Sequence, residues 1–394
     1  MKEDSQTVLQ QRVETAAKKN HAVTELITDP PGQPSPDSET LRGVRALWFR
    51  LTHWETWDWR IKYLLIGPAW LWCCLRARSA WFFTASNPTL TFGGFDGESK
   101  REMYEQLPVG TYPKSIFISP LMPDHEVQRL VDVHGFSFPF AVKPDSGKMG
   151  FMFRKITSPE DLKKYHHRIG CDYIIQEWVS YPVEVSVFYY RLPQAKKGII
   201  TGFVRKDFLE VIGDGRSTVW DLILKYPRAR FRLDEMKSKH AGRLTHVLAQ
   251  GERYCLSPAL NLSRGGRLVS LEHEKDERLL KVFDTLSRAA GGFHYGRYDV
   301  KCSSIEDLKE GRNFSVLEYN GSGAEPHHVY GNGYSLWEAC SILVAHWNIL
   351  CLISRENHRA GIPYWEFLKG WRFLINAGKH QKRLRRIDSE NALD

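Results

Sequence analysis

The distribution of apolar and polar residues predicts short β-strands interleaved with amphipathic helices. Runs with a period of two predict strands, and apolar positions three and four residues apart predict helices. We expect strands at residues 115–119, 138–142, 151–156, 172–179, 183–191, 199–203, 295–301 and 314–320. We expect helices at 99–106, 124–134, 279–290 and 335–354, with two more beginning near 158 and 217.

The last two predicted strands carry a group of polar residues that stands out from the apolar background. Side chains two positions apart in a strand share a face, so Arg297 lies beside Asp299, and Glu318 beside Asn320. If the strands pair, three oxygen-bearing side chains form a cluster with a guanidinium next to it. Such a cluster suits a hard cation such as Mg²⁺, and an arginine suits a phosphate. Solvated acids on an edge strand are the alternative.

A glycine-rich turn separates the second and third predicted strands. Lys143 ends the first of these two strands, and Gly147, Lys148 and Gly150 lie in the turn. Glycines let the backbone amides of a loop approach phosphate oxygens, and a lysine supplies positive charge. A Walker loop opens a helix, whereas this stretch runs from strand to strand and predicts a hairpin flap. An ordinary turn is the alternative.

Several other residues are candidates for binding. Glu184 lies among valines in a strand, where a carboxylate needs a partner or the hydroxyls of a ligand. Lys206 follows the strand at 199–203, and Arg264 lies in a glycine loop suited to an anion. The histidine pairs 166–167 and 327–328 have no matching acid or cysteine spacing, so we expect them at the surface.

Tryptophan is concentrated between Trp48 and Trp81, which contain seven of the 13 tryptophans. The apolar run Tyr63–Leu75 would form a helix roughly 20 Å long, against about 30 Å of bilayer hydrocarbon. We expect Gly67-Pro68 to break that helix. Basic residues flank the run on both sides. Two interpretations stay open: a segment lying in a membrane interface, or a helical hairpin buried against the rest of the protein.

Composition narrows the class of protein. The 42% hydrophobic content excludes a wholly disordered chain, although the polar residues 1–40 predict an arm without a packed core. The net charge of +9 includes a basic run at Lys379–Arg386, which we expect to be a solvated end, with anionic lipid or nucleic acid as alternative partners. Seven cysteines without a CxxC pair, and no signal-peptide pattern, favour a cytosolic setting. Basic and aromatic residues do not interleave, which argues against nucleic-acid binding.

The chain resembles the ATP-grasp superfamily, because these motifs occur in the same order along the sequence. It looks most like the branch that contains D-alanine–D-alanine ligase and the glutathione and cyanophycin synthetases. The resemblance covers roughly residues 113–332 and rests on an ordered combination: Lys143, the glycine turn, 176–179, Glu184, 297–299 and 318–320. It implies an α+β, ATP-grasp fold, in which two β-rich subdomains clamp ATP between them, with a Trp-rich helical N-terminal segment and C-terminal helices added to this core.

The resemblance also implies a role for each candidate. ATP would contact Lys143, Gly147, Lys148, Gly150, Gln176, Glu177, Trp178, Val179, Glu184 and Lys206. Two Mg²⁺ ions, or Mn²⁺, would be held by Asp299, Glu318 and Asn320, with Arg297 and Arg264 as catalytic residues. The family's second phosphate lysine has no clear match, because Lys114 precedes its strand. Gln176 stands where the family often has glutamate.

These observations and the resemblance together predict a division of the chain into five segments and one type of reaction. The segments are an arm at 1–40, a Trp-rich segment at 41–98, the two ATP-grasp subdomains at 99–182 and 183–332, and helices with a basic tail at 333–394. The expected reaction joins a small-molecule carboxylate to an amine through an acyl phosphate, in the cytoplasm or at the inner face of the membrane. An ATP-binding module without ligation, held at the membrane through Trp48–Trp81, is one alternative. Phosphotransfer to a hydroxyl is the other, and the sequence does not predict the oligomeric state.

Overall fold

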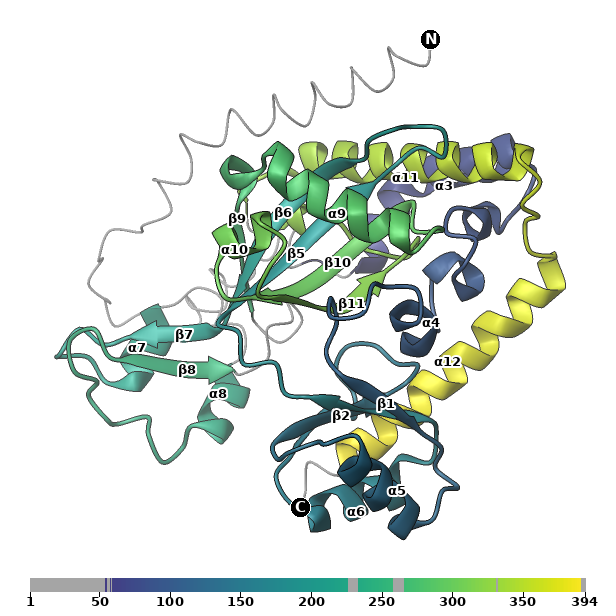
Figure 1. Cartoon of the computed structure of the whole chain (residues 1–394). Coiled ribbons are helices and arrows are strands. Elements are labelled where there is room, and N and C mark those ends of the chain that lie inside the picture. The colour runs from purple at the N-terminus through teal and green to yellow at the C-terminus, as the bar shows by residue number, and fades with distance from the viewer. Residues whose placement is uncertain are drawn as a thin grey trace.

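The computed structural model describes residues 54, 57, 59–225, 233–257, 266–330 and 332–390. Arg264, Trp48 and the predicted arm at 1–40 lie outside these residues. Two larger sheets and one two-stranded sheet, each with its own helices, make up the described part (Figure 1). Every strand pair in it is antiparallel, and the mixture of helices and sheets confirms the expected α+β class.

The first sheet lies at the lower end of the molecule in Figure 1. Its strands, in spatial order, are β1 (Ser115–Ile118), β4 (Tyr173–Glu177), β2 (Phe140–Pro144) and β3 (Arg154–Ile156). Helices α5 (Asp124–Val133) and α6 (Pro159–Ile169) share a buried apolar cluster with one face of the sheet. Strand β3 is shorter than the expected 151–156, because Met149 and Met152 have positive φ and residues 151–152 form a turn.

The second sheet is sandwiched between helices. Its order is β11 (Phe314–Asn320), β10 (Tyr295–Cys302), β5 (Val183–Tyr190), β6 (Ile199–Asp207) and β9 (Arg267–Ser270). One face packs Tyr298 and Tyr319 against α9 (Glu277–Ala289), beside the short α10 (Ile305–Lys309). On the other face, Phe188 and Tyr295 pack against the short helix η3 (Phe82–Ala85) and the long helix α11 (Leu336–Arg359).

A small unit projects from the second sheet. It contains β7 (Leu209–Ile212), β8 (Arg253–Ser257), α7 (Val219–Lys225) and α8 (Leu233–Lys239). Its apolar cluster, which includes Leu209, Ile223 and Met236, is separate from the cores of the two larger sheets. The described helices and strands are completed by η4 (Thr91–Gly94), α4 (Lys100–Tyr104), η7 (Glu272–Glu274) and η8 (His327–Val329).

Helix α3 (Trp59–Ala77) lies alongside α11 (Figure 1). The expected break at Gly67-Pro68 is wrong, because Pro68 lies inside one continuous helix. The proline ring is on the exposed side, while Ile66 and Cys73 are buried on the other. Among the described helices, α11 alone has the length and apolar composition of a membrane span, and 44% of its most apolar stretch is buried inside the protein.

Helix α12 (Phe367–Glu390) connects the two larger sheets. It starts near η3 and η4 and ends against the first sheet, where Leu384 is fully buried (Figure 1). The basic run Lys379–Arg386 is therefore part of a packed helix, and its lysines and arginines are exposed.

Candidate functional site

Lys143 links the two larger sheets. It lies on β2, and its Nζ donates to Tyr104 Oη at 3.2 Å and to the backbone carbonyl of Leu317 on β11 at 3.4 Å. Burial lowers the pKa of this ammonium to about 8, although the neighbouring Glu318 carboxylate opposes the change. Lys143 thus holds a poorly solvated amine next to the end of β11.

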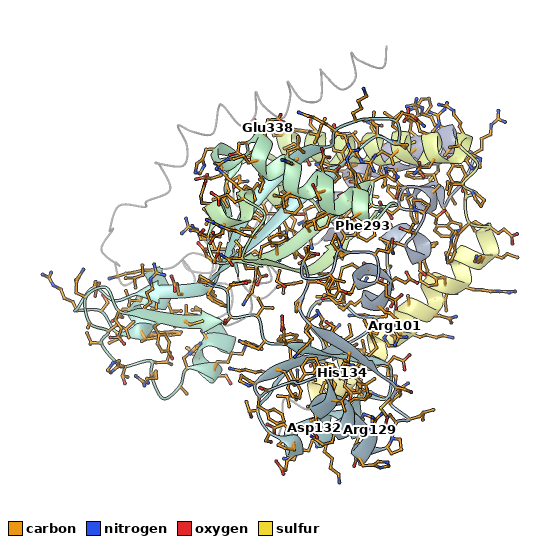
Figure 2. All side chains as sticks on the ribbon, viewed as in Figure 1. Arg101, Arg129, Asp132, His134, Phe293 and Glu338 are labelled. Carbon is orange, nitrogen blue, oxygen red and sulfur yellow. The ribbon has the colours of Figure 1, made fainter. Side chains whose placement is uncertain are left out.

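Lys100 reaches the same place from another element. Ser99 caps α4, and Lys100 follows as the first residue of the helix. The Lys100 Nζ donates to the carbonyl of Gly147 at 2.9 Å and lies 4.0 Å from Glu318 Oε1. Helix α4 is held against the first sheet by Arg101, whose guanidinium lies 4.5 Å from the centre of the Phe117 ring (Figure 2).

Sequence reasoning missed Lys100 and considered only Lys114. The Lys114 Nζ donates to the carbonyls of His134 and Gly135 on the surface, and Lys114 does not line the cavity described below. The signal for Lys100 was present, because the Ser99 cap places the next side chain at the N-terminus of α4. Its long-range partner Glu318 could not be read from the sequence.

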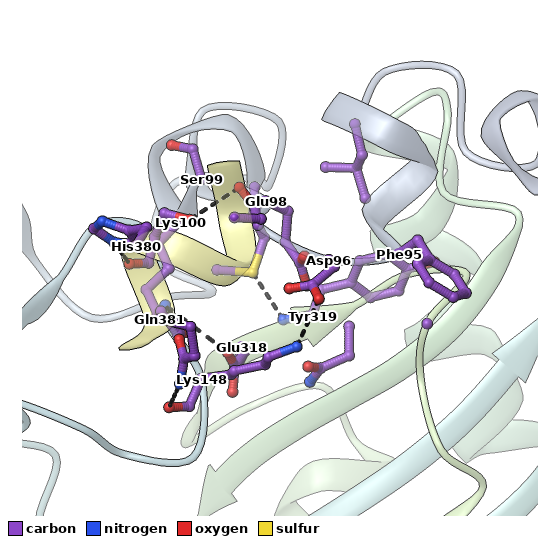
Figure 3. A pocket seen from close by; sticks show the side chains of 18 residues that line it. Phe95, Asp96, Glu98, Ser99, Lys100, Lys148, Glu318, Tyr319, His380 and Gln381 are labelled. Atoms are coloured by element: carbon purple, nitrogen blue, oxygen red, sulfur yellow. Dashed lines mark hydrogen bonds and ion pairs between the residues drawn. The ribbon is translucent and has the colours of Figure 1, made fainter. Parts of the chain in front are cut away.

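A cavity of about 130 Å³ opens beside Lys100 and the glycine turn (Figure 3); Lys100 lines it, and Lys143 does not. Its walls come from four places: the loop before α4, the glycine turn, the end of β11 and helix α12. The lining includes ten polar or charged side chains, namely Asp96, Glu98, Ser99, Lys100, Ser146, Lys148, Glu318, Asn320, His380 and Gln381. Burial raises the pKa of Glu98, and the nearby Glu318 carboxylate adds to this effect. The cavity can therefore hold an anion at its lysines and a cation or amine at its carboxylates.

The glycine turn forms one wall of the cavity. Gly147 and Lys148 line it, and Lys148 makes an ion pair with Asp96 at 2.7 Å. Gly150 lies in the exposed part of the turn with a φ of 69°.

Helix α12 holds this turn from the other side. His380 Nε2 donates to the carbonyl of Ser146 at 2.8 Å, and Gln381 Nε2 donates to that of Lys148 at 3.3 Å. Figure 3 shows both side chains beside the turn. Local sequence patterns could not predict this contact, because more than 230 residues separate the partners.

The expected pairing of β10 with β11 is confirmed. Arg297 lies opposite Asn320, and Asp299 opposite Glu318, so all four side chains belong to one face. Arg297 Nε and Nη2 each donate to Asp299 at 3.1 Å, and Asn320 Nδ2 lies 3.4 Å from Asp299 Oδ2. The three predicted metal ligands Asp299, Glu318 and Asn320 are thus neighbours on the paired strands.

Asp299 has further partners on the neighbouring strands. Lys206 Nζ lies 3.1 Å from Asp299 and 3.2 Å from Glu184, and Ser186 Oγ donates to Asp299. Burial alone would raise the pKa of Asp299, but Arg297 and Lys206 hold it well below its usual range. Glu184 is therefore paired with a lysine, and Asp299 is a buried anion surrounded by cations.

Of the three predicted metal ligands, two line the cavity and one does not. Glu318 and Asn320 offer oxygen atoms to the cavity, and Glu318 is about a third exposed, with Lys100 4.0 Å away. Asp299 is not among the lining residues, and its oxygens accept hydrogen bonds from Arg297 and Ser186. Among the described residues, no group of three or more His, Cys, Asp or Glu side chains forms a metal site. Mg²⁺ prefers oxygen ligands, and the side-chain oxygens of Glu318 and Asn320 are the ones that such an ion could reach from the cavity.

The predicted adenine-binding segment lies at the end of β4. Gln176 is buried and donates to Tyr104 Oη at 3.0 Å and to Ser115 Oγ at 2.8 Å. Glu177 and Trp178 are exposed, and the carbonyl of Val179 accepts from Lys301 Nζ at 3.2 Å. Gln176 thus supports Tyr104, the residue that also contacts Lys143.

The expectation of surface histidines is wrong for three of the four. His166 is buried between Tyr173 and the carbonyl of Met122. His327 lies 3.3 Å from Ser186 Oγ beside Asp299, and His328 is buried next to it. Burial lowers the pKa of both well below the usual value.

No protein-family model and no curated protein sequence matches the chain. Among solved structures, a bifunctional glutathione synthetase from Pasteurella multocida matches 56% of the chain and 32% of its own length, with 14% identity and a TM-score of 0.37. D-alanine–D-alanine ligase from Bacillus anthracis matches 67% of the chain and 69% of its own length, with 14% identity and a TM-score of 0.39. The ATP-grasp ligase PsnB matches 63% and 60%, with 14% identity and a TM-score of 0.34. These matches bear the names of the same group of ligases that the sequence resembles.

Proposed function

We propose that the protein is an ATP- and Mg²⁺-dependent ligase that joins a carboxylate to an amine through an acyl phosphate. One observation carries this proposal: two lysines from different elements, Lys143 and Lys100, converge on the end of β11 beside the cavity. Two buried ammonium groups next to a glycine turn suit the phosphates of a nucleotide. The Glu318 and Asn320 oxygens at the same point suit the metal that accompanies such phosphates.

The chemistry needs little more than positioning and charge. A carboxylate oxygen of the acid attacks the γ-phosphorus, ADP leaves, and an acyl phosphate remains. The ammonium groups of Lys143 and Lys100 stabilise the negative charge that develops on the phosphoryl oxygens. Mg²⁺ bound at Glu318 and Asn320 would neutralise further charge on the phosphates.

The second half of the reaction forms the carbon–nitrogen bond. The amine nitrogen attacks the acyl carbon, inorganic phosphate leaves, and the nitrogen loses a proton. Glu98 lines the cavity, and its raised pKa makes it a better proton acceptor than an ordinary surface carboxylate. No nucleophilic side chain is required.

A trapping experiment tests the reaction. The protein is incubated with ATP, Mg²⁺, hydroxylamine and pools of small carboxylic acids, and both hydroxamate and ADP are measured. We expect acid-dependent hydroxamate and ADP with the wild type, and at least a tenfold loss in Lys143→Met. Lys114→Met is the matched control, because its ammonium lies on the surface away from the cavity.

Two outcomes would overturn the proposal. ATP binding without ADP release on any acid would indicate a nucleotide-binding module. A stable phosphate ester formed from an alcohol, with no hydroxamate, would indicate phosphotransfer from the same site.

A further inference from the structure

Helix α3 presents an apolar face to the outside of the protein. Six large side chains on this face are between 49% and 78% exposed: Ile61, Leu64, Leu65, Leu71, Trp72 and Leu75. Their spacing of three and four residues places them in one stripe along the helix. The outward face of a helix packed on a water-soluble core is normally polar, so this stripe calls for an apolar partner.

The opposite face of α3 is already occupied. Ile66 and Cys73 are buried there, and Cys73 Sγ donates to the carbonyl of Trp347 on α11. Tyr63 also stacks on Trp347, with ring centres 5.8 Å apart. Helix α3 is thus fixed along its length against the protein, and its outer stripe is held in place for a partner.

The first turns of α12 carry a second group of exposed apolar residues. Phe367, Leu368, Trp371 and Ile375 are between 42% and 63% exposed. Trp81, just beyond the end of α3, stacks on Phe367 with ring centres 5.8 Å apart and donates its indole N–H to the Phe367 carbonyl. This contact joins the end of α3 to the start of α12.

Exposed basic residues border both groups, together with the exposed Glu366 directly before α12. No aspartate or glutamate occurs from Trp59 to Phe95, while Arg76 and Arg78 lie exposed at the end of α3. On α12, Lys369 and Arg372 are exposed among the apolar residues, and five more exposed lysines and arginines follow: Lys379, Lys382, Arg383, Arg385 and Arg386. Apolar and aromatic side chains bordered by basic ones are the pattern of a helix that lies on an anionic bilayer.

We propose that the outer stripe of α3 and the first turns of α12 form a docking surface for an anionic membrane. The stripe from Ile61 to Leu75 is about 21 Å long, shorter than the roughly 30 Å hydrocarbon core, and its other face is bound to α11. The helix would therefore lie in the interface without crossing. A symmetric contact with a second copy would bring the same basic border against itself, whereas anionic lipid would neutralise it. This proposal does not depend on the ligase activity.

A vesicle flotation experiment tests the docking surface. The full chain is mixed with vesicles of phosphatidylcholine alone or with 30% phosphatidylserine, and the floated fraction is measured at low and high salt. We expect binding to the anionic vesicles, weakened by salt. The double variant Leu64→Glu/Leu71→Glu should bind at least tenfold less, because two charges then replace apolar contacts.

The matched control replaces apolar residues that are more exposed than Leu64 and Leu71 but lie elsewhere in the chain. Val109 and Leu121 are 92% and 91% exposed, so Val109→Glu/Leu121→Glu adds the same charge outside α3 and α12. This variant should float like the wild type. Equal flotation of both double variants, or no association of the wild type with anionic vesicles, would overturn the proposal. So would a wild-type dimer, seen by sedimentation, that Leu64→Glu/Leu71→Glu abolishes while no vesicle binding occurs.

Discussion

Replacing Lys143 with methionine tests whether this lysine serves to bind ATP or to stabilise the fold. The Lys143 side chain is half-buried, its ammonium contacts neutral oxygens, and Glu318 only partly compensates for the lost hydration. Lys143→Met keeps most of the apolar stem and removes the charge. We expect the ligand-free variant to be more stable than the wild type at pH 7, and to bind ATP more weakly.

The magnitude follows from the pKa of Lys143. The difference between the ordinary 10.5 and about 8 corresponds to about 3 kcal/mol of destabilisation while the amine is charged. Since Lys143 keeps some contact with solvent, we expect Lys143→Met to gain about 2 kcal/mol at pH 7. The loss of a charge-assisted hydrogen bond to phosphate should weaken ATP binding about 10- to 100-fold.

The sign of the pH dependence provides a second check. Between about 8 and 10.5 the unfolded chain holds the Lys143 proton and the folded chain does not. The free energy of unfolding of the wild type therefore rises with pH across this window, relative to the variant. ATP affinity of the wild type should fall over the same window, because the charged amine is the form that binds phosphate.

Urea unfolding at pH 7 and pH 9.5, with calorimetric ATP titration, measures both effects. Lys114→Met is the control and should leave ATP affinity unchanged, with unfolding altered by less than about 1 kcal/mol. If Lys143→Met were less stable than the wild type at pH 7 and bound ATP equally well, the reasoning would be refuted, and Lys143 would be a structural residue.

Three further predictions concern the same site. Asp299→Asn leaves Arg297 and Lys206 without their anion, so the free energy of unfolding should fall by about 3 kcal/mol in urea titrations, and an unchanged value would contradict the buried ion pairs. Lys100→Met should weaken ATP binding about tenfold but leave adenosine binding unchanged in calorimetry; equal losses for both ligands would argue against a phosphate contact. His380→Ala removes a donor to the glycine turn, and hydrogen exchange of the turn amides should become faster, whereas unaltered exchange would show that α12 does not hold the turn.

The sequence was most informative where side chains follow a period of two. Asp299 lies opposite Glu318, and Arg297 opposite Asn320, because both strands alternate their faces and pair directly. The metal-binding and catalytic roles of these residues stay predictions. The structure adds the ion pairs that Asp299 makes. Asp299 is held by Arg297, two positions away on the same strand, and by Lys206 on β6, which spacing alone could not pair with it.

Other features depended on packing between distant segments. Lys100 meets Glu318, and His380 meets the glycine turn, across more than two hundred residues. Pro68 failed to break α3 because packing on α11 outweighs the loss of one backbone hydrogen bond on the exposed side. Local patterns report backbone preferences, whereas these contacts arise only once the sheets and helices are assembled.

A crystal of the protein grown with Mn²⁺ and a non-hydrolysable ATP analogue would test the central claim most directly, through anomalous scattering from the metal. The account predicts a manganese peak within coordination distance of Glu318 and Asn320, with analogue phosphates at the Lys143 and Lys100 ammonium groups. A nucleotide bound elsewhere, or phosphates that contact neither lysine, would contradict it.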